Sequence, residues 1–253
     1  MSVGGPRIAP MAAAGDFAHL HVHTEYSMLD GAAKIDDLLA EVKRLGQRSV
    51  AMTDHGFLFG AYEFWSKARA AGIKPIIGIE AYNTPGTSRF DKTRVRWGES
   101  HQKDDDVSGA GAITHLTLWA RNNEGLHNLF RLGSMASLEG QMGKWPRMDR
   151  ELLARYSGGL IAGTACPSGE VQTSLRLGQY DEALRAAGEL QDIFGKGNLY
   201  VEVMDHGIEI ETRVQKDLIR LAHDLGAPLL ATNDSHYVRP EDHDAHDAML
   251  CIN

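Results

Sequence analysis

From residue 17 onward the chain alternates short apolar runs with segments of helical period, and this alternation is the strongest constraint on its fold. The apolar runs are rich in Val, Ile and Leu, which favour β-strands, and they occupy residues 17–22, 49–53, 74–82, 113–120, 159–164, 199–204 and 228–232. Amphipathic helices are predicted between them, at residues 35–45, 60–71, 126–137, 180–194 and 209–225. Strands that alternate with helices build an α/β fold around a parallel sheet.

Seven such units fit either an open doubly wound sheet or a closed barrel. An open sheet that binds dinucleotides carries a glycine-rich phosphate loop after its first strand, and residues 23–34 contain no such loop. We therefore expect a seven-stranded (βα) barrel. Residues 1–16 are rich in Ala, Gly and Pro without periodicity and are predicted to form a flexible tail, which leaves 17–253 as one domain.

Composition excludes several classes of protein. The chain is 43% hydrophobic and 24% charged, as globular proteins are, and it has neither an apolar run of about 18 residues nor a secretory signal, so a cytoplasmic location is expected. Two cysteines, Cys166 and Cys251, are too few for a disulfide framework and are predicted to be free thiols. The net charge of -8 argues against a broad basic surface for nucleic acid. A phosphate ligand would need local positive charge, which metal ions could supply.

Metal-binding residue types recur where the predicted strands end. They are His21 and His23 on the first strand, Asp54 and His55 after the second, Glu80 near the end of the third, Cys166 after the fifth, and Asp234 and His236 after the seventh. The carboxyl ends of the strands in a parallel barrel open on one face, where residues far apart in sequence meet. The sequence therefore predicts a site for several metal ions, which would hydrolyse phosphate esters.

Local geometry supports some of these candidates more than others. Side chains two apart on a strand point the same way, so His21 and His23 can chelate one ion, as can Asp234 and His236. Glu80 ends an otherwise apolar strand, where it either binds metal or points to solvent. Other roles remain open for Asp54, as a helix cap or a neighbour of the ligands, and for Cys166, as a small buried apolar residue or the nucleophile of a Cys/His pair.

Several polar residues are interpreted as ordinary. Histidines at six other positions are assigned to packing, helices or polar loops: His19, His101, His127, His223, His243 and His246. Asp205 and His206 follow the sixth strand, but a turn and a helix cap explain them, and they are kept outside the site. Residues 83–112 form a long polar loop, with Arg89, Lys92, Arg94, Arg96 and Lys103, that is either a lid over the substrate or a mobile segment.

The motifs HVHTEYSMLDG (21–31), TDHG (53–56), IGIEAY (77–82) and TNDSHY (232–237) resemble the polymerase and histidinol phosphatase (PHP) family. The resemblance covers residues 17–253, including KWPRM (144–148) and CPSGE (166–170), and is closest to the PHP domains of replicative DNA polymerase III alpha subunits of the actinobacterial type. It implies a distorted seven-stranded (βα) barrel. The final residues, 246–253, end on an apolar run without a stop signal, so we expect a domain cut from a longer polymerase chain.

The resemblance also implies the ligands. Active members of the family hold three metal ions through nine residues, which correspond to His21, His23, Asp30, His55, Glu80, His115, Cys166, Asp234 and His236. Only through the resemblance do Asp30, His115 and Cys166 become ligands. Mixed imidazole, carboxylate and thiolate ligands favour zinc, with manganese or iron as alternatives, and Glu80 is expected to bridge two ions.

An intact ligand set implies a 3′-5′ exonuclease that proofreads by hydrolysing the terminal phosphodiester with metal-activated water. Its partners would be a DNA 3′ end and, in the full-length protein, the remainder of the polymerase and the replisome with its sliding clamp. No association with a membrane is expected. Two alternatives remain: a phosphomonoesterase of the PHP family that acts on small molecules, and a structural module that the metal only stabilises.

Overall fold

Seven strands form one curled mixed sheet in the computed structural model, which describes residues 17–28, 30–98 and 108–252. The strands follow the order β1 (Ser49–Met52), β2 (Lys74–Asn83), β3 (Thr114–Ala120), β5 (Leu160–Gly163), β6 (Leu199–Val203) and β7 (Leu229–Ala231), and β4 (Arg147–Met148) pairs with β2 outside this path. The tail predicted at 1–16 lies outside the described residues.

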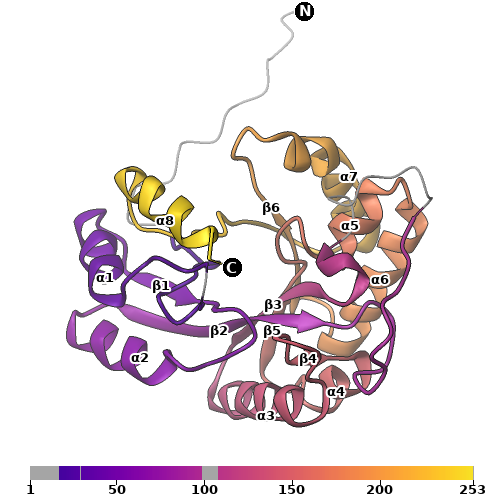
Figure 1. Cartoon of the computed structure of the whole chain (residues 1–253), viewed down its shortest axis with the longest axis horizontal. Coiled ribbons are helices and arrows are strands. Elements are labelled where there is room, and N and C mark those ends of the chain that lie inside the picture. Colours follow the sequence, from indigo (N-terminus) through magenta and orange to yellow (C-terminus); the bar gives the residue numbers. More distant parts are fainter. Residues whose placement is uncertain (1–16, 29, 99–107, 253) are drawn as a thin grey trace, which may run out of the picture.

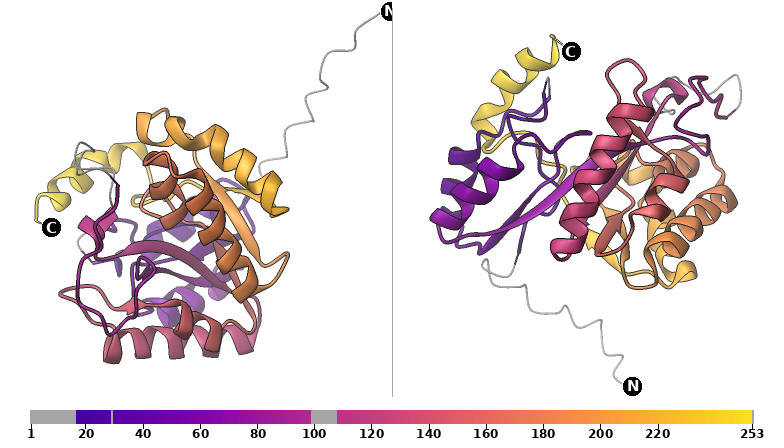
Figure 2. Two further views of the ribbon diagram at one scale, coloured as in Figure 1. Left: turned by 90° about the vertical axis from the view of Figure 1, so that its right-hand side faces the viewer. Right: turned by 90° about the horizontal axis from the view of Figure 1, so that it is seen from below.

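Helices surround the sheet in Figure 1, and the two views of Figure 2 show α3 packed along its outside. They are α1 (Ile35–Arg44), α2 (Ala61–Ala70), α3 (Asn123–Glu139), α4 (Arg150–Arg155), α5 (Glu170–Arg176), α6 (Tyr180–Phe194), α7 (Glu209–Leu225) and α8 (His243–Leu250), with short 3-10 turns at η3 (Ser108–Gly111) and η4 (Pro240–Asp242). All five predicted helices are confirmed. In α1, for example, Leu38, Leu39 and Val42 are buried as the helical period requires.

The prediction that all strands are parallel is wrong for β3. β1 and β2 are parallel, as are β5, β6 and β7, but β3 runs antiparallel to both of its neighbours. A parallel pair needs a long crossover connection, usually a helix. Within its described part, the connection from β2 to β3 contains only the short turn η3, and the chain returns beside β2 in the opposite direction.

The first predicted strand, 17–22, is also wrong as a regular strand, but residues 19–23 lie where that strand would be. We call them the seam segment. The amide of Ala51 bonds to the carbonyl of His19 (2.9 Å), and the amide of His23 bonds to the carbonyl of Ser235 (2.8 Å), so the segment links the two edges of the sheet.

In the seam segment, side chains form hydrogen bonds with backbone groups that would bond to a neighbouring strand in a regular sheet. The amide of Val22 donates to Oγ1 of Thr53 (2.8 Å), and the carbonyl of Leu20 accepts from Nε1 of Trp119 (2.7 Å). The short elements β4, α4, α5 and α8 were not predicted, because segments of eight residues or fewer show too little periodicity for a helix or strand to be recognised.

The described residues of the polar loop after β2 form no regular strand or long helix, as predicted, but residues 84–98 are firmly attached. Arg147 is completely buried and donates to the carbonyls of Arg89 (3.1 Å), Asp91 (2.6 Å) and Gly140 (3.1 Å). Arg89 itself bonds to Asp149 at 2.9 Å. Residues 84–98 are thus held against α3 and α4, whereas Lys103 lies outside the described residues.

Candidate metal centre

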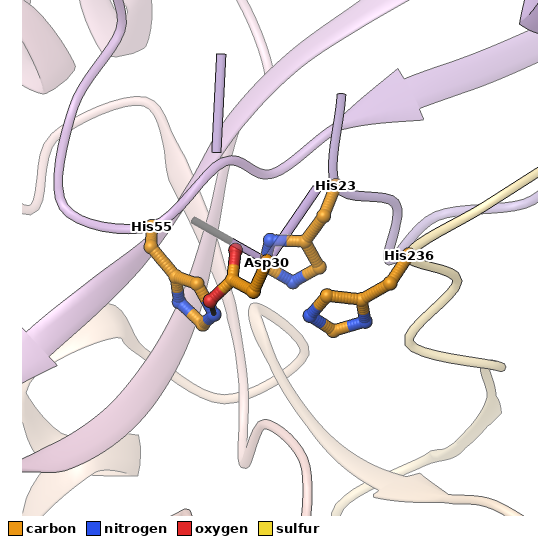
Figure 3. A group of neighbouring side chains, drawn as sticks. All are labelled: His23, Asp30, His55 and His236. Atoms are coloured by element: carbon orange, nitrogen blue, oxygen red, sulfur yellow. Dashed lines mark ion pairs between the residues drawn. The ribbon is translucent and has the colours of Figure 1, made fainter. Parts of the chain in front are cut away.

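The nine side chains implied as ligands come from seven parts of the fold and meet at one end of the sheet. His21 and His23 lie in the seam segment, Asp30 in the turn after it, His55 after β1, Glu80 in β2, His115 in β3, Cys166 after β5, and Asp234 and His236 after β7. Figure 3 shows four of them, His23, Asp30, His55 and His236, as neighbours. The convergence follows from the curled sheet, which brings the ends of its strands to one mouth.

Glu80 lies at the centre of this cluster and is completely buried. One carboxylate oxygen, Oε2, lies 3.2 Å from Nε2 of His23 and 3.0 Å from Nδ1 of His55. The other, Oε1, lies 3.0 Å from Nδ1 of His115 and 3.2 Å from Sγ of Cys166. The alternative in which Glu80 points to solvent is therefore wrong. Its two oxygens face two different sets of candidate ligands, as a carboxylate that bridges two ions would.

The reversed direction of β3 explains why His115 occurs early in its strand. His115 is the second residue of β3 and pairs with Tyr82, near the carboxyl end of β2. In an antiparallel strand, the amino end lies at the mouth where the neighbouring parallel strands end. His115 thus reaches the same mouth as Glu80.

The segment after β7 closes the cluster from the other edge of the sheet. Oδ1 of Asp234 lies 3.3 Å from Nε2 of His21 and 3.0 Å from Nε2 of His23. The backbone of Asp234 has a φ of 46°, in the left-handed region that few residues other than glycine adopt. The ring of His236 stacks on that of His23 with 4.1 Å between centroids. On the far side, Oδ2 of Asp30 is 3.1 Å from Nε2 of His55.

Unsatisfied polar atoms indicate that the cluster is built for cations. Within the cluster, six buried atoms have no hydrogen-bond partner in the described part of the chain: His21 Nε2, His23 Nε2, His55 Nδ1, Glu80 Oε2, Asp30 Oδ1 and Asp234 Oδ1. Burying such atoms without a partner is costly. Several approach each other at 3.0–3.3 Å without hydrogen-bond geometry, as ligand atoms directed at a common ion do.

The donor atoms form three overlapping groups, each small enough to hold one ion. The groups are His23, Asp30, His55 and His236; His21, His23, Glu80 and Asp234; and His55, Glu80 and His115. Imidazole nitrogens and carboxylate oxygens are suitable ligands for zinc, manganese and iron. The residues present therefore fit divalent metal ions.

The pKa values show how strongly the acids and imidazoles interact. Burial by itself lowers the pKa of His21, but Asp234, Glu80 and Glu202 raise it well above its ordinary value. Burial opposes the ionised form of Glu80, yet His115, His21 and His55 lower the pKa of this carboxyl well below its usual range. The carboxylates thus require positive charge beside them. Divalent ions would supply it when the imidazoles are neutral.

The alternative of a Cys/His nucleophilic pair is disfavoured by the surroundings of Cys166. Its Sγ is 3.5 Å from Nδ1 of His115, but burial and the carboxylates of Glu80 and Asp234 raise the pKa of the thiol well above its usual value. The reactive form of a cysteine is the thiolate. Both cysteines are free thiols, as predicted.

Glu202 in β6 is a site residue that the sequence analysis missed. It is almost completely buried, its Oε2 accepts from Nδ1 of His21 (3.0 Å) and from Oγ1 of Thr232 (2.9 Å), and its Oε1 accepts from the amide of Ala165 (2.9 Å). A carboxylate can only accept, so His21 carries its proton on Nδ1 and turns Nε2 toward the cluster. The signal was present, because Glu202 interrupts an apolar strand as Glu80 does.

Other neighbours of the ligands have clear roles. Asp54 does not cap α2, whose N-cap is Gly60, but accepts from the amide (2.6 Å) and hydroxyl (2.8 Å) of Thr24. Ser27 contacts Nδ1 of His23 at 2.9 Å. His246 is not an ordinary terminal residue, since its Nε2 donates to the carbonyl of Asp30 (2.8 Å).

The remaining histidines lie away from the ligands or outside the described residues. The ring of His19 packs edge-on against that of Phe17. Three others are exposed, namely His127, His223 and His243, and His101 lies outside the described residues.

Residues 19–206 match the model of the PHP domain. The chain belongs to the PHP family. This PHP domain is 58% identical over 241 residues to the DNA polymerase III subunit alpha of Mycobacterium tuberculosis strain H37Rv, with 95% of the chain and 20% of that relative covered. It is also 58% identical over 243 residues to the subunit of the same name from Saccharopolyspora erythraea, with 93% and 20% covered. The PHP domain thus spans about a fifth of the length of these relatives.

Two solved structures share the fold of this PHP domain at a TM-score of 0.50. One is a candidate metal-dependent phosphoesterase from Bifidobacterium adolescentis, 15% identical, with 92% of this chain and 95% of that chain covered. The other is an amidohydrolase from Chromobacterium violaceum with bound sulfate and no metal, 14% identical, with 92% and 96% covered. In the described part of the PHP domain, every helix is too short or too polar to cross a bilayer.

Proposed function

We propose that this PHP domain is the metal-dependent 3′-5′ exonuclease of a DNA polymerase III alpha subunit, and that it removes nucleotides from a DNA 3′ end during proofreading. The observation that carries the proposal is that all nine implied ligands are present and gathered around the buried carboxylate of Glu80. The identity of 58% with DNA polymerase III alpha subunits supports the assignment to that enzyme. The remainder of such a polymerase and its replisome would be the partners.

The proposed site holds three divalent ions, and the three overlapping groups of donors support that number. Zinc is favoured because the sulfur of Cys166, deprotonated when it binds a metal, would join imidazoles and carboxylates, and manganese and iron are the alternatives. In the proposed fold, the seam segment stands in for a strand beside the six strands of the main path, with β4 outside it, and completes a distorted seven-stranded barrel.

The chain's own residues have distinct roles in this proposal. When bound, the ions supply Lewis acidity toward water and toward the phosphate oxygens. Glu202 and Ser27 fix the rings of His21 and His23 through their Nδ1 atoms. Asp54 holds the backbone of Thr24, next to His23. These contacts pre-organise the ligands, so that little reorganisation is required when substrate binds.

A structural module stabilised by metal is the second candidate, and one observation favours it. The ligands His21 and His23 lie on one edge of the sheet, and Asp234 and His236 lie on the other, so bound ions would fasten the two edges together. The proposed enzyme and the module share this site, and they differ in whether DNA is cleaved.

The test is to incubate the metal-loaded chain with 5′-labelled single-stranded DNA, beside an Asp234→Asn variant. We expect stepwise shortening from the 3′ end that a chelator stops and that the variant lacks. A blocked 3′ end and p-nitrophenyl phosphate serve as comparison substrates. Hydrolysis of the monoester alone would identify a small-molecule phosphatase, and a metal-bound chain that cleaves neither substrate would favour the structural module.

A further inference from the structure

A cavity of about 540 Å³ opens beside Asp234 and His236, and the ligand set does not account for its other walls. One wall comes from His206 and Ile208 in the turn between β6 and α7 and from Glu211 in the first turn of α7, and the other from residues 233–237 and from His246 of α8. Its volume falls within the range of about 300–1,000 Å³ that is usual for pockets that bind small molecules. It is thus large enough for a nucleoside, not only for an ion.

His206 is held at this wall by a buried carboxylate. Glu211 is only 6% exposed, and its Oε1 lies 2.7 Å from Nδ1 of His206. Its Oε2 accepts from the backbone amide of His206 at 2.7 Å. The amide contact fixes the turn before α7, whose N-cap is Ile208, and the second contact of Glu211 in addition orients the imidazole of His206.

The carboxylate determines which nitrogen of His206 is available to a ligand. Because a carboxylate only accepts, Nδ1 of His206 carries a proton, and in the neutral ring Nε2 is then an acceptor. Glu202 fixes the ring of His21 by the same contact. His206, however, lines the cavity and contributes to none of the three donor groups among the described residues. Its Nε2 is suited to accept a hydrogen bond from a hydroxyl group.

Aromatic rings form part of the opposite wall. The rings of Tyr237 and His246 lie 5.2 Å apart, and His246 is fixed by its bond to the carbonyl of Asp30. Aromatic side chains stack with nucleobases regardless of sequence. The cavity therefore combines a hydroxyl acceptor on one side with a surface for a base on the other, next to the candidate metal ligands Asp234 and His236.

We propose that this cavity is the subsite for the 3′-terminal nucleoside of the DNA strand, in which Nε2 of His206 accepts the hydrogen bond of the free 3′-hydroxyl and Tyr237 contacts the base. The inference rests on the proposed function and assigns the end of the substrate that the enzyme recognises. It explains why Glu211 is buried against the ring of His206 in addition to its contact with the backbone.

The test compares the binding of two probes to the metal-loaded chain at pH 8 by calorimetry: 2′-deoxyadenosine 5′-monophosphate and its 2′,3′-dideoxy analogue, which lacks the 3′-hydroxyl. We expect the first to bind about five- to tenfold more tightly, as one hydrogen bond allows. In His206→Ala this ratio should fall to about one. His223→Ala, which removes an exposed histidine of α7, should keep it.

Two further variants separate recognition from folding. Glu211→Gln keeps an acceptor for the amide of His206 but presents an amide N–H to Nδ1, which moves the ring proton to Nε2; the 3′-hydroxyl must then accept from the ring, so the ratio should fall less than in His206→Ala. Tyr237→Ala should weaken both probes by about fivefold or more without changing the ratio. Metal content and melting temperature check that each variant is folded.

Equal binding of the two probes to the wild type, or a ratio that persists in His206→Ala, would overturn the inference. Failure of the proposed function can be distinguished from failure of this inference, because cleavage of DNA by the wild type is measured in a separate assay from the binding of the two probes. A wild type that prefers the 3′-hydroxyl but leaves DNA intact would support the subsite and would count against the exonuclease.

Discussion

Glu80 joins the candidate ligands into a single network. Its two oxygens contact imidazoles from the seam segment, from β3 and from the loop after β1, together with the thiol of Cys166. It lies in an apolar strand and is completely buried, so its charge must be compensated inside the protein. Any change in this carboxylate therefore alters the surroundings of several candidate ligands at once.

We predict that Glu80→Gln binds at least one ion fewer than the wild type and loses at least about 100-fold in hydrolytic activity, because even residues behind the ligands contribute 10- to 100-fold. X-ray fluorescence or inductively coupled plasma analysis gives the metal content. Glu182→Gln, on the exposed side of α6, should change neither quantity. A full complement of ions in Glu80→Gln would show that this residue is not a ligand.

The carboxylate of Glu202 acts through His21, and its replacement should have a smaller effect. Gln can still accept from the amide of Ala165 but no longer holds the Nδ1 proton of His21 with a charge. We expect Glu202→Gln to weaken metal affinity by about 10- to 100-fold while the protein stays folded. Competition with a fluorescent chelator measures this change, and an unaltered affinity would limit Glu202 to a packing role.

At the scale of elements, residue patterns predicted the long helices and most strands, because each buries a regular stripe of apolar residues. The direction of β3 was not predictable in this way, since an antiparallel strand carries the same residue types as a parallel one. His115 could therefore be assigned only through the family resemblance. Asp30 and Cys166 lie in turns, where no periodicity shows which way a side chain points.

Arg147 of β4 provides a test of how the loop after β2 is held. Replacement by Met should lower the free energy of unfolding by at least about 3 kcal/mol, because several buried carbonyls lose their partner at about 1–3 kcal/mol each. Arg155→Met, at an exposed position of α4, should cost less than about 0.5 kcal/mol. Urea unfolding measures both, and similar losses in the two variants would contradict the anchoring role.

The ion pairs of Glu41, with Arg44 in α1 and with Arg239 before α8, should weaken as the pH falls. Hydrogen bonding by Arg44 lowers the pKa of Glu41 to about 2, while burial opposes the shift and Arg239 adds to it. A carboxyl whose pKa is lower in the folded chain than its ordinary 4.5 stabilises the fold above about pH 4.5, and this stabilisation is lost as the pH falls toward 2.

Unfolding of Glu41→Gln should consequently depend less on pH between 4.5 and 2 than that of the wild type. Urea titrations at several pH values measure the two slopes, and added salt should reduce their difference because Arg44 and Arg239 are exposed. Parallel slopes would show that the ion pair forms equally in the unfolded chain.

For the whole molecule, the metal centre and the closure of the sheet occupy the same place. The seam segment meets residues 233–236 through the backbone and through the candidate ligands. Ions that bind only the folded chain stabilise it by about 2.7 kcal/mol at 100 times their dissociation constant. A domain of this size would gain roughly 2–4 °C in melting temperature per kcal/mol.

We therefore predict that a chelator lowers the melting temperature by several degrees and that zinc restores it. Differential scanning calorimetry of the chain before and after dialysis gives the shift. Asp234→Asn should melt below the zinc-loaded wild type and respond less to the chelator. Identical melting temperatures with and without chelator would mean that the centre contributes nothing to closure.

The seam also has a consequence for the order in which the protein acquires its structure during synthesis. His21 and His23 leave the ribosome before any of the strands, yet their partner Asp234 and the backbone of Ser235 are made only after β7. The nascent chain must keep these imidazoles available while β1 to β7 emerge. Capture of metal at the seam can be completed only after the last strand has been translated, so it marks a late step in the assembly of this domain.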